Sequence, residues 1–89
     1  MLVGLKAVTF ENLRMREADL TGARSTGAVL RHLDLSGAAI AKANFDKCDL
    51  RGSDISSIDP WSASLNATII TWEQAAVLAM AMGLDVRAD

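Results

Sequence analysis

The stretch that decides the fold is residues 38–55, AAIAKANFDKCDLRGSDI. A large apolar residue stands at every fifth position, and a small residue stands two positions before each one. The large residues are Ile40, Phe45, Leu50 and Ile55, and the small ones are Ala38, Ala43, Cys48 and Ser53. The same frame runs upstream to Leu5 and downstream to Ile70. A repeat of fixed period is typical of a solenoid, whose units bury their apolar side by stacking on their neighbours.

A period of five fits neither an α-helix nor a flat β-strand. At about 100° per residue, five helical steps end about 140° from the start, so the apolar residues would wind around a helix. In a strand, residues five apart point to opposite faces. Every fifth residue stays inside only if the chain turns a corner once per unit. Four corners close a coil of about 20 residues, with successive coils about 4.8 Å apart.

The sequence units Ala18–Gly22, Ala43–Lys47 and Cys48–Gly52 follow the pattern A(D/N)LXX. This pattern resembles the pentapeptide-repeat family and runs from about residue 3 to residue 70. The resemblance implies an all-β solenoid, a right-handed quadrilateral β-helix of about three and a half coils. We therefore expect a β-helix over residues 1–70 and a capping and dimerisation helix with a tail over residues 71–89, together forming one domain.

The N-terminal coil follows the repeat poorly. Val3, Val8 and Leu13 stand where a small residue is expected, and no polar cap precedes them. A solenoid normally needs a polar outer face at its ends. Three alternatives stay open: the chain is a fragment of a longer solenoid, a partner covers this end, or residues 1–4 fold over it.

Two further positions depart from the repeat. Ser25 is a polar residue at an inward position between Leu5 and Phe45, and we expect its hydroxyl to bond a nearby backbone group, because a buried hydroxyl needs a partner. Pro60 occupies another inward position and removes a backbone donor from the ladder. Trp61 beside it is expected to face outward.

From Thr71 onward the pattern changes to that of a helix. Thr71 followed by Gln74 is a capping-box signature, and Gly83 is a candidate C-cap. The sequence predicts a helix from about Trp72 to Met82. After Gln74 this helix has no polar residue, and a helix that is apolar all round must be buried.

We expect one side of the helix to close the coil end over Leu65 and Ile70, and the other side to pack on the same helix of a second subunit in a two-fold dimer. The alternative is a helix that only caps its own coil. The expected dimer residues are Trp72, Ala75, Ala76, Leu78, Ala79, Met80 and Met82.

Composition excludes several classes of protein. The chain has 89 residues and a net charge of −2, whereas a nucleic-acid-binding protein of this size carries an excess of Lys and Arg. A single Cys fits a reducing compartment, and no apolar run approaches the ~18 residues of a membrane span. The first ten residues do not resemble a signal peptide, so we expect a cytoplasmic protein that does not bind membranes or nucleic acid directly.

No group of residues predicts catalysis. Cys48 is lone and inward, which favours packing, and His32 has no second ligand near it for a metal. Nothing assembles a base, a nucleophile and an oxyanion donor. We expect no enzyme activity, no cofactor and no metal.

The charge pattern is more informative. The position before an inward residue holds Asp19, Asp34, Asn44, Asp49, Asp54 and Asp59. Because residues 20 apart stack on one face, four of them gather along one edge of the rod: Asp19, Asp34, Asp54 and Asp59, here called the acidic edge. These side chains either accept backbone hydrogen bonds at the corners, or they imitate a nucleic-acid backbone.

The C-terminal part has a narrower resemblance. It is carried by Asp59, Pro60, Trp61, Leu65, Gln74, Ala75, Gly83 and Leu84. This part resembles the C-terminal end of the quinolone-resistance pentapeptide proteins, the Qnr and MfpA group. The resemblance implies a homodimer through the terminal helix and binding of DNA gyrase as a DNA mimic. The alternatives are a generic β-helix scaffold with another protein partner, or a fragment of a longer repeat protein.

Overall fold

A computed structural model describes residues 8–40 and 42–87 of the chain. The regular elements in these ranges are strand β1 (Thr9–Glu11), strand β2 (Val29–Arg31) and helix α1 (Trp72–Ala81). β1 and β2 pair in parallel with Phe10 beside Leu30. The strands are short because a chain that turns a corner in each pentapeptide leaves only two or three residues straight.

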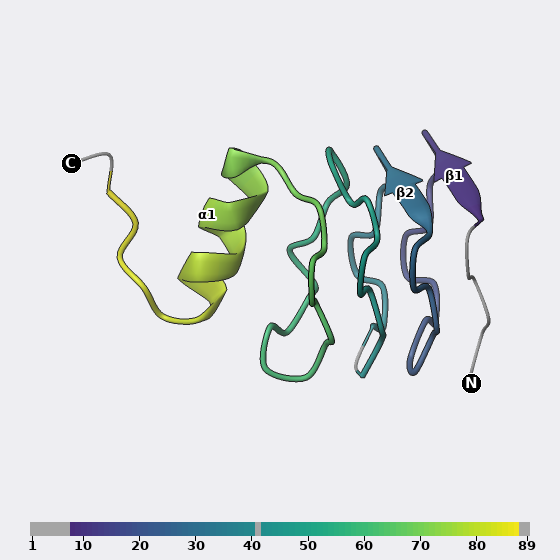
Figure 1. Ribbon diagram of the computed structural model, residues 1–89. Coiled ribbons are helices and arrows are strands. Elements are labelled where there is room, and N and C mark those ends of the chain that lie inside the picture. The colour runs from purple at the N-terminus through teal and green to yellow at the C-terminus, as the bar shows by residue number, and fades with distance from the viewer. Residues whose placement is uncertain (1–7, 41, 88–89) are drawn as a thin grey trace.

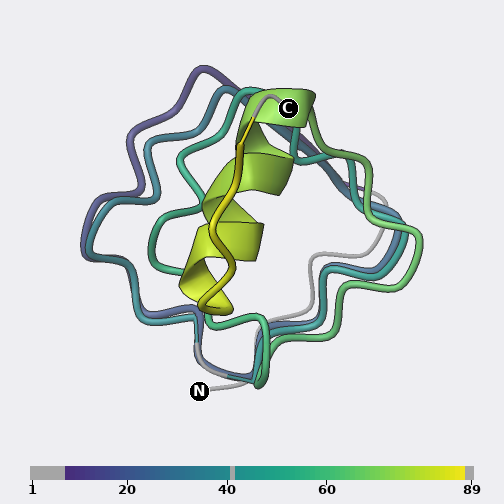
Figure 2. The same ribbon diagram turned by 90° about the vertical axis from the view of Figure 1, so that its left-hand side faces the viewer.

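The parallel pairing continues around the coil as isolated bridges. They join Arg14 to Asp34, Asp19 to Ala39, Arg24 to Asn44, Val29 to Asp49, Asn44 to Ser64 and Asp49 to Ile69. Each bridge joins residues 20 apart, which matches the predicted length of one coil. Figure 1 shows the coils side by side with α1 at one end of the stack, and Figure 2, seen from the α1 end, shows them superimposed in a roughly square outline.

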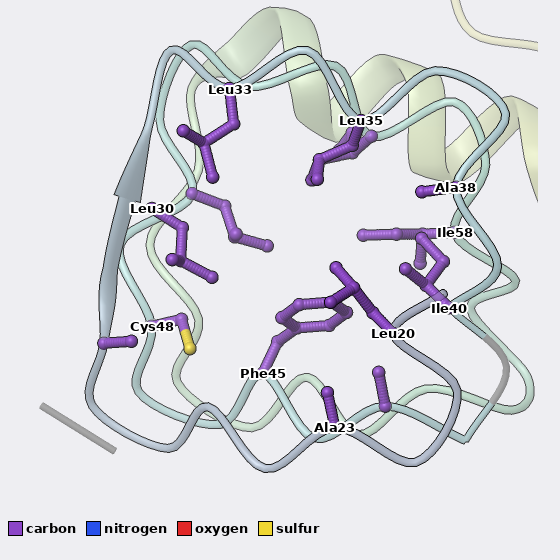
Figure 3. Packing of buried hydrophobic residues seen from close by; sticks show 14 residues of the cluster. Leu20, Ala23, Leu30, Leu33, Leu35, Ala38, Ile40, Phe45, Cys48 and Ile58 are labelled. Carbon is purple, nitrogen blue, oxygen red and sulfur yellow. The ribbon is translucent and has the colours of Figure 1, made fainter. Parts of the chain in front are cut away.

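The inside of the coils is filled by the residues of the five-residue frame. Phe45 is 1% exposed and Leu50 is 0% exposed, and Figure 3 shows such side chains pointing into the space that the coils enclose. The buried hydrophobic cluster is Leu20, Ala23, Ala28, Leu30, Leu33, Leu35, Ala38, Ile40, Ala43, Phe45, Cys48, Leu50, Ile55 and Ile58. The predicted inward positions are therefore buried through the centre of the chain.

Buried polar side chains in the cluster bond the backbone of a neighbouring coil. The Ser25 hydroxyl donates to the carbonyl of Asn44 at 2.6 Å, which confirms the structural role predicted for it. Leu5, its other predicted neighbour, lies outside the described residues. Ser53 accepts from the Leu33 N–H at 2.9 Å and donates to the Leu30 carbonyl at 2.5 Å. These bonds satisfy hydroxyls that would otherwise be costly inside an apolar lumen.

One corner requires a glycine for lack of space. Gly52 has a φ of +79°, and a Cβ built on it would lie 2.3 Å from His32 Nδ1 in the coil before. Gly27 has a similar φ of +76° but no neighbour within 4 Å of such a Cβ. The left-handed conformation alone is tolerated by other residues at these corners, because His32 itself adopts it with a φ of 55°. Gly52 is thus set apart by close packing.

Helix α1 begins with the predicted capping box. The Thr71 hydroxyl accepts from the Gln74 N–H at 3.2 Å, and Gln74 Oε1 accepts from the Thr71 N–H at 2.8 Å. The helix ends at Ala81, with Met82 as the cap residue and Gly83 following at a φ of 89°. The end thus falls one residue earlier than predicted, and Gly83 follows the cap in the left-handed conformation that lets the chain leave the helix.

Gln74 also closes the end of the coil stack. In the coils, a backbone N–H donates to the carbonyl 21 residues earlier, as Asn44 does to Ala23 at 2.8 Å and Ser64 does to Ala43 at 3.0 Å. The same offset from position 74 leads to Ser53. There the Gln74 side chain replaces the missing backbone donor, because its Nε2 donates to Ser53 O at 2.8 Å and to Leu50 O at 2.6 Å.

Candidate functional site: the acidic edge and the outer face of α1

Each side chain of the acidic edge first serves its own corner. Oδ1 accepts the backbone N–H two residues later in Asp19, Asp34, Asp54 and Asp59, at 3.1, 3.1, 3.0 and 2.9 Å. Asn44 and Asp49 make the same bond at 2.9 and 3.2 Å. The predicted role of these side chains as corner acceptors is therefore present at all six positions.

Serine hydroxyls reinforce two of these corners. Ser36 Oγ donates to Asp34 Oδ1 at 2.6 Å, and Ser56 Oγ donates to Asp54 Oδ1 at 2.6 Å. The Ser36 hydroxyl and then its backbone N–H hold the pKa of Asp34 below its ordinary value, and the backbone N–H of Thr21 does the same to the pKa of Asp19. These hydrogen bonds favour the charged form of each carboxyl.

Basic side chains interrupt the acidic edge. Arg14 pairs in the ladder with Asp34, and Arg16 Nε lies 3.5 Å from Asp34 Oδ2. The Asp54 backbone N–H bonds Leu33 O, next to Asp34, which places the two aspartates in one stack. Ala39 lies one ladder step from Asp19, on the stack that Asp59 shares by its 20-residue offset from Ala39. The predicted stacking is therefore consistent with the ladder, but the edge is not continuously negative.

Two other carboxylates have partners of their own. Asp49 forms a two-point ion pair with Arg51, with Nε–Oδ1 at 2.9 Å and Nη2–Oδ2 at 2.7 Å. Asp46 Oδ1 accepts from Ser64 Oγ at 2.6 Å and from the Asn66 N–H at 2.8 Å in the next coil. The role of Asp46 was not predicted, and its spacing of 18 and 20 residues from these partners is the signal that could have revealed it.

The outer face of α1 is uncovered in the single chain. Trp72 is 92% exposed and Met80 is 61% exposed, while Met82 and Val77 are 43% and 40% exposed. Leu78 instead packs against the buried cluster of its own coils. The expectation that this helix is buried all round is therefore wrong for one copy of the chain.

The remaining predicted dimer residues are Ala75, Ala76 and Ala79, which are half-buried. Trp72, Val77 and Met80 form an apolar surface on the side of α1 away from the coils, here called the outer face of α1. Val77 was not among the predicted dimer residues. Spacings of three and four residues from Glu73 and Met80 place it beside that face.

Residues with catalytic or ligand chemistry stand alone. Cys48 is buried, and burial raises the pKa of its thiol. In the part of the chain that the structure describes, no three His, Cys, Asp or Glu side chains lie close enough together to hold a metal ion. Across residues 8–40 and 42–87, no helix has the length and apolar character needed to cross a membrane.

The repeats define the class of protein. Residues 26–56 match the family model of pentapeptide repeats, in eight copies. The predicted resemblance to the pentapeptide-repeat family is thereby confirmed, and it implies a right-handed β-helix. No curated protein matches the sequence.

Solved structures extend the likeness. The chain is similar to two trypsin-treated forms of QnrB1, a plasmid-mediated fluoroquinolone resistance protein, with 28% identity to each and TM-scores of 0.50 and 0.51. The similar region covers 94% and 96% of this chain but only 43% and 44% of the QnrB1 chains. The chain therefore spans less than half the length of the proteins it matches.

Proposed function

We propose that this chain is a non-enzymatic, cytoplasmic pentapeptide-repeat protein of the quinolone-resistance type. Its β-helix would be quadrilateral, and it would bind DNA gyrase as a mimic of DNA. The observation that carries the proposal is the likeness to a fluoroquinolone resistance protein at 28% identity over nearly the whole chain. The sequence resemblance to the Qnr and MfpA group supplies gyrase as the partner.

The acidic edge is the surface that would contact gyrase. Duplex DNA carries about one charge per 1.7 Å. Coils about 4.8 Å apart with one Asp on each of two adjoining faces give about one charge per 2.4 Å. Arg14 and Arg16 reduce that density at Asp34. Mimicry would therefore act along one edge of the rod only.

The supercoiling assay tests this proposal. The chain at micromolar concentration should inhibit supercoiling by gyrase or protect gyrase from a fluoroquinolone. An unchanged gyrase activity at every concentration tried would favour a scaffold that binds another protein. The local bonds of the corner aspartates support that second candidate, because they explain these residues without a partner.

The acidic edge has a variant that separates charge from folding. Asp34→Asn with Asp54→Asn removes two charges but keeps the acceptor that each corner needs, since Asn44 already fills such a corner. Gyrase inhibition should fall several-fold. The matched control is Glu17→Gln with Asp85→Asn, which removes two exposed carboxylates outside the acidic edge and should leave inhibition unchanged. Equal effects of the two pairs would rule out the acidic edge.

The outer face of α1 would form the dimer. Trp72, Val77 and Met80 expose an apolar surface that a second copy covers in a two-fold arrangement. Met80→Glu should shift sedimentation from dimer to monomer and leave the circular dichroism spectrum unchanged. Leu78→Glu is a poorer probe, because Leu78 packs on its own coils. A dimer that survives Met80→Glu would contradict this interface.

A further inference from the structure

The backbone ladder is interrupted on one side of the last coil. In the regular coils an inward residue donates its N–H to the carbonyl 19 residues later, as Phe45 does to Ser64 at 2.8 Å and Leu50 does to Ile69 at 2.9 Å. For Ile55 the corresponding residue is Gln74, which belongs to α1. Among the residues that the structure describes, the Ile55 N–H therefore has no backbone acceptor.

A second donor two residues later is left in the same state. At the equivalent corner of the coil, the Lys47 N–H donates to Asn66 O at 2.9 Å. The same offset from Ser57 leads to Ala76, which also lies in α1. Within residues 8–40 and 42–87, no backbone carbonyl accepts from Ser57. Two N–H groups with the spacing of a strand edge thus lack the acceptors that a next coil would supply.

A cavity lies where that next coil is missing. Its volume is about 260 Å³, and residues 52–56 of the last coil and Thr71, Glu73, Gln74 and Val77 of the α1 region line it. We call it the α1 groove. Ligand pockets usually measure about 300–1,000 Å³. The α1 groove therefore has room for one or two residues of an extended chain and not for a large cofactor.

The charges of the α1 groove select the kind of ligand. Asp54 and Glu73 are exposed, and no Lys or Arg of the described chain forms an ion pair with either. Asp54 uses Oδ1 for the N–H and hydroxyl of Ser56, which leaves Oδ2 available. Two carboxylates repel an anion, although the free N–H groups require an acceptor. A ligand must therefore combine neutral acceptors with a positive charge.

We propose that the α1 groove binds an extended peptide segment that carries Lys or Arg, by addition of a strand to residues 53–57. The peptide carbonyls accept from the free N–H groups of Ile55 and Ser57, as a neighbouring coil would. The basic side chain lies between Asp54 and Glu73, and Val77 supplies an apolar wall. This inference does not depend on gyrase or on the acidic edge.

The test uses two peptides and amide NMR of the full chain. The probe is acetyl-Val-Lys-Val-Lys-amide, and its match is acetyl-Val-Glu-Val-Glu-amide. The Lys peptide should shift the amide signals of Ile55 and Ser57 downfield in a saturable way, and slow their hydrogen exchange. The Glu peptide should bind about tenfold more weakly, because it meets two carboxylates. Equal binding of both peptides, or no saturable shift at either amide, overturns the proposal.

Variants separate the groove from general electrostatic attraction. Asp54→Asn with Glu73→Gln should weaken the Lys peptide about fivefold, the effect of losing one or two exposed ion pairs. Asp19→Asn with Asp85→Asn removes the same charge elsewhere and should leave the affinity unchanged. Equal weakening by both pairs overturns the proposal.

A second copy of the chain is the competing occupant of the α1 groove. In that case, hydrogen exchange at Ile55 and Ser57 would slow as the protein concentration rises without any peptide. That result would also overturn the peptide proposal, and Met80→Glu, examined in parallel, would show whether the dimer itself is present.

Discussion

The most informative perturbation is the replacement of Gln74 by leucine. Gln74 Nε2 bonds Leu50 O at 2.6 Å and Ser53 O at 2.8 Å, and Leu50 and Ser53 are 0% and 5% exposed. Leucine is of similar size but offers no donor, so both buried carbonyls lose their partner. An unpaired buried polar group costs about 1–3 kcal/mol. Gln74→Leu should therefore lower the free energy of unfolding by about 2–5 kcal/mol.

That loss is large for a chain of this size. At roughly 0.05–0.15 kcal/mol per residue, 89 residues correspond to a free energy of unfolding of about 4–13 kcal/mol. The assay is urea unfolding followed by circular dichroism, with all variants at one protein concentration. Gln74→Leu should lower the urea midpoint strongly without changing the spectrum of the folded state.

Two control variants isolate the bonds to the last coil. Thr71→Ala removes the cap hydroxyl but leaves both Nε2 bonds, so it should cost about 1 kcal/mol. Glu73→Gln changes an exposed neighbour and should stay within about 0.5 kcal/mol. If Gln74→Leu costs no more than Thr71→Ala, Gln74 is only a cap residue, and its proposed role in closing the coil stack is refuted.

Two other predictions concern a glycine corner and acid stability. Gly52→Ala should destabilise the fold more than Gly27→Ala, because only the first places a methyl group against His32, and the addition of His32→Ala should bring the two costs together; equal costs in urea unfolding would contradict this. The Ser64 hydroxyl lowers the pKa of Asp46, so the unfolded chain takes up a proton there at a higher pH than the folded chain. This contribution to stability is present above the ordinary pKa of about 3.9 and is lost as the pH falls through the lower folded value. Asp46→Asn should therefore make the urea midpoint less dependent on pH below about 5, and an unchanged pH dependence would show that this bond is not responsible.

The inside of the coils could be predicted because it depends only on spacing. A five-residue period admits one repeated corner, and the same period places Phe45 and Leu50 inside. The start of α1 was also predictable, since a capping box is a local pattern of Thr71 and Gln74. The bond from Ser25 to a backbone carbonyl followed from the cost of burying a hydroxyl.

Other features depend on what lies beside a residue in space. The capping box accounts for Gln74 within its own helix, so nothing in the local sequence indicated that its amide reaches Leu50 and Ser53. The exposure of Met80 was missed because the sequence shows that α1 is apolar but not what covers it. The carboxylates of the acidic edge could be placed from the repeat, whereas the approach of Arg16 to Asp34 depends on side-chain conformation.

The central claim is that the chain coils with a period of 20 residues and encloses every fifth side chain. Proton NMR cross-peaks between backbone groups test it most directly. The account predicts contacts between residues one coil apart, such as Val29 with Asp49 and Asn44 with Ser64, and slow exchange of the Phe45 and Leu50 amides. Contacts three and four residues apart through the centre of the chain, with those between coils absent, would contradict it.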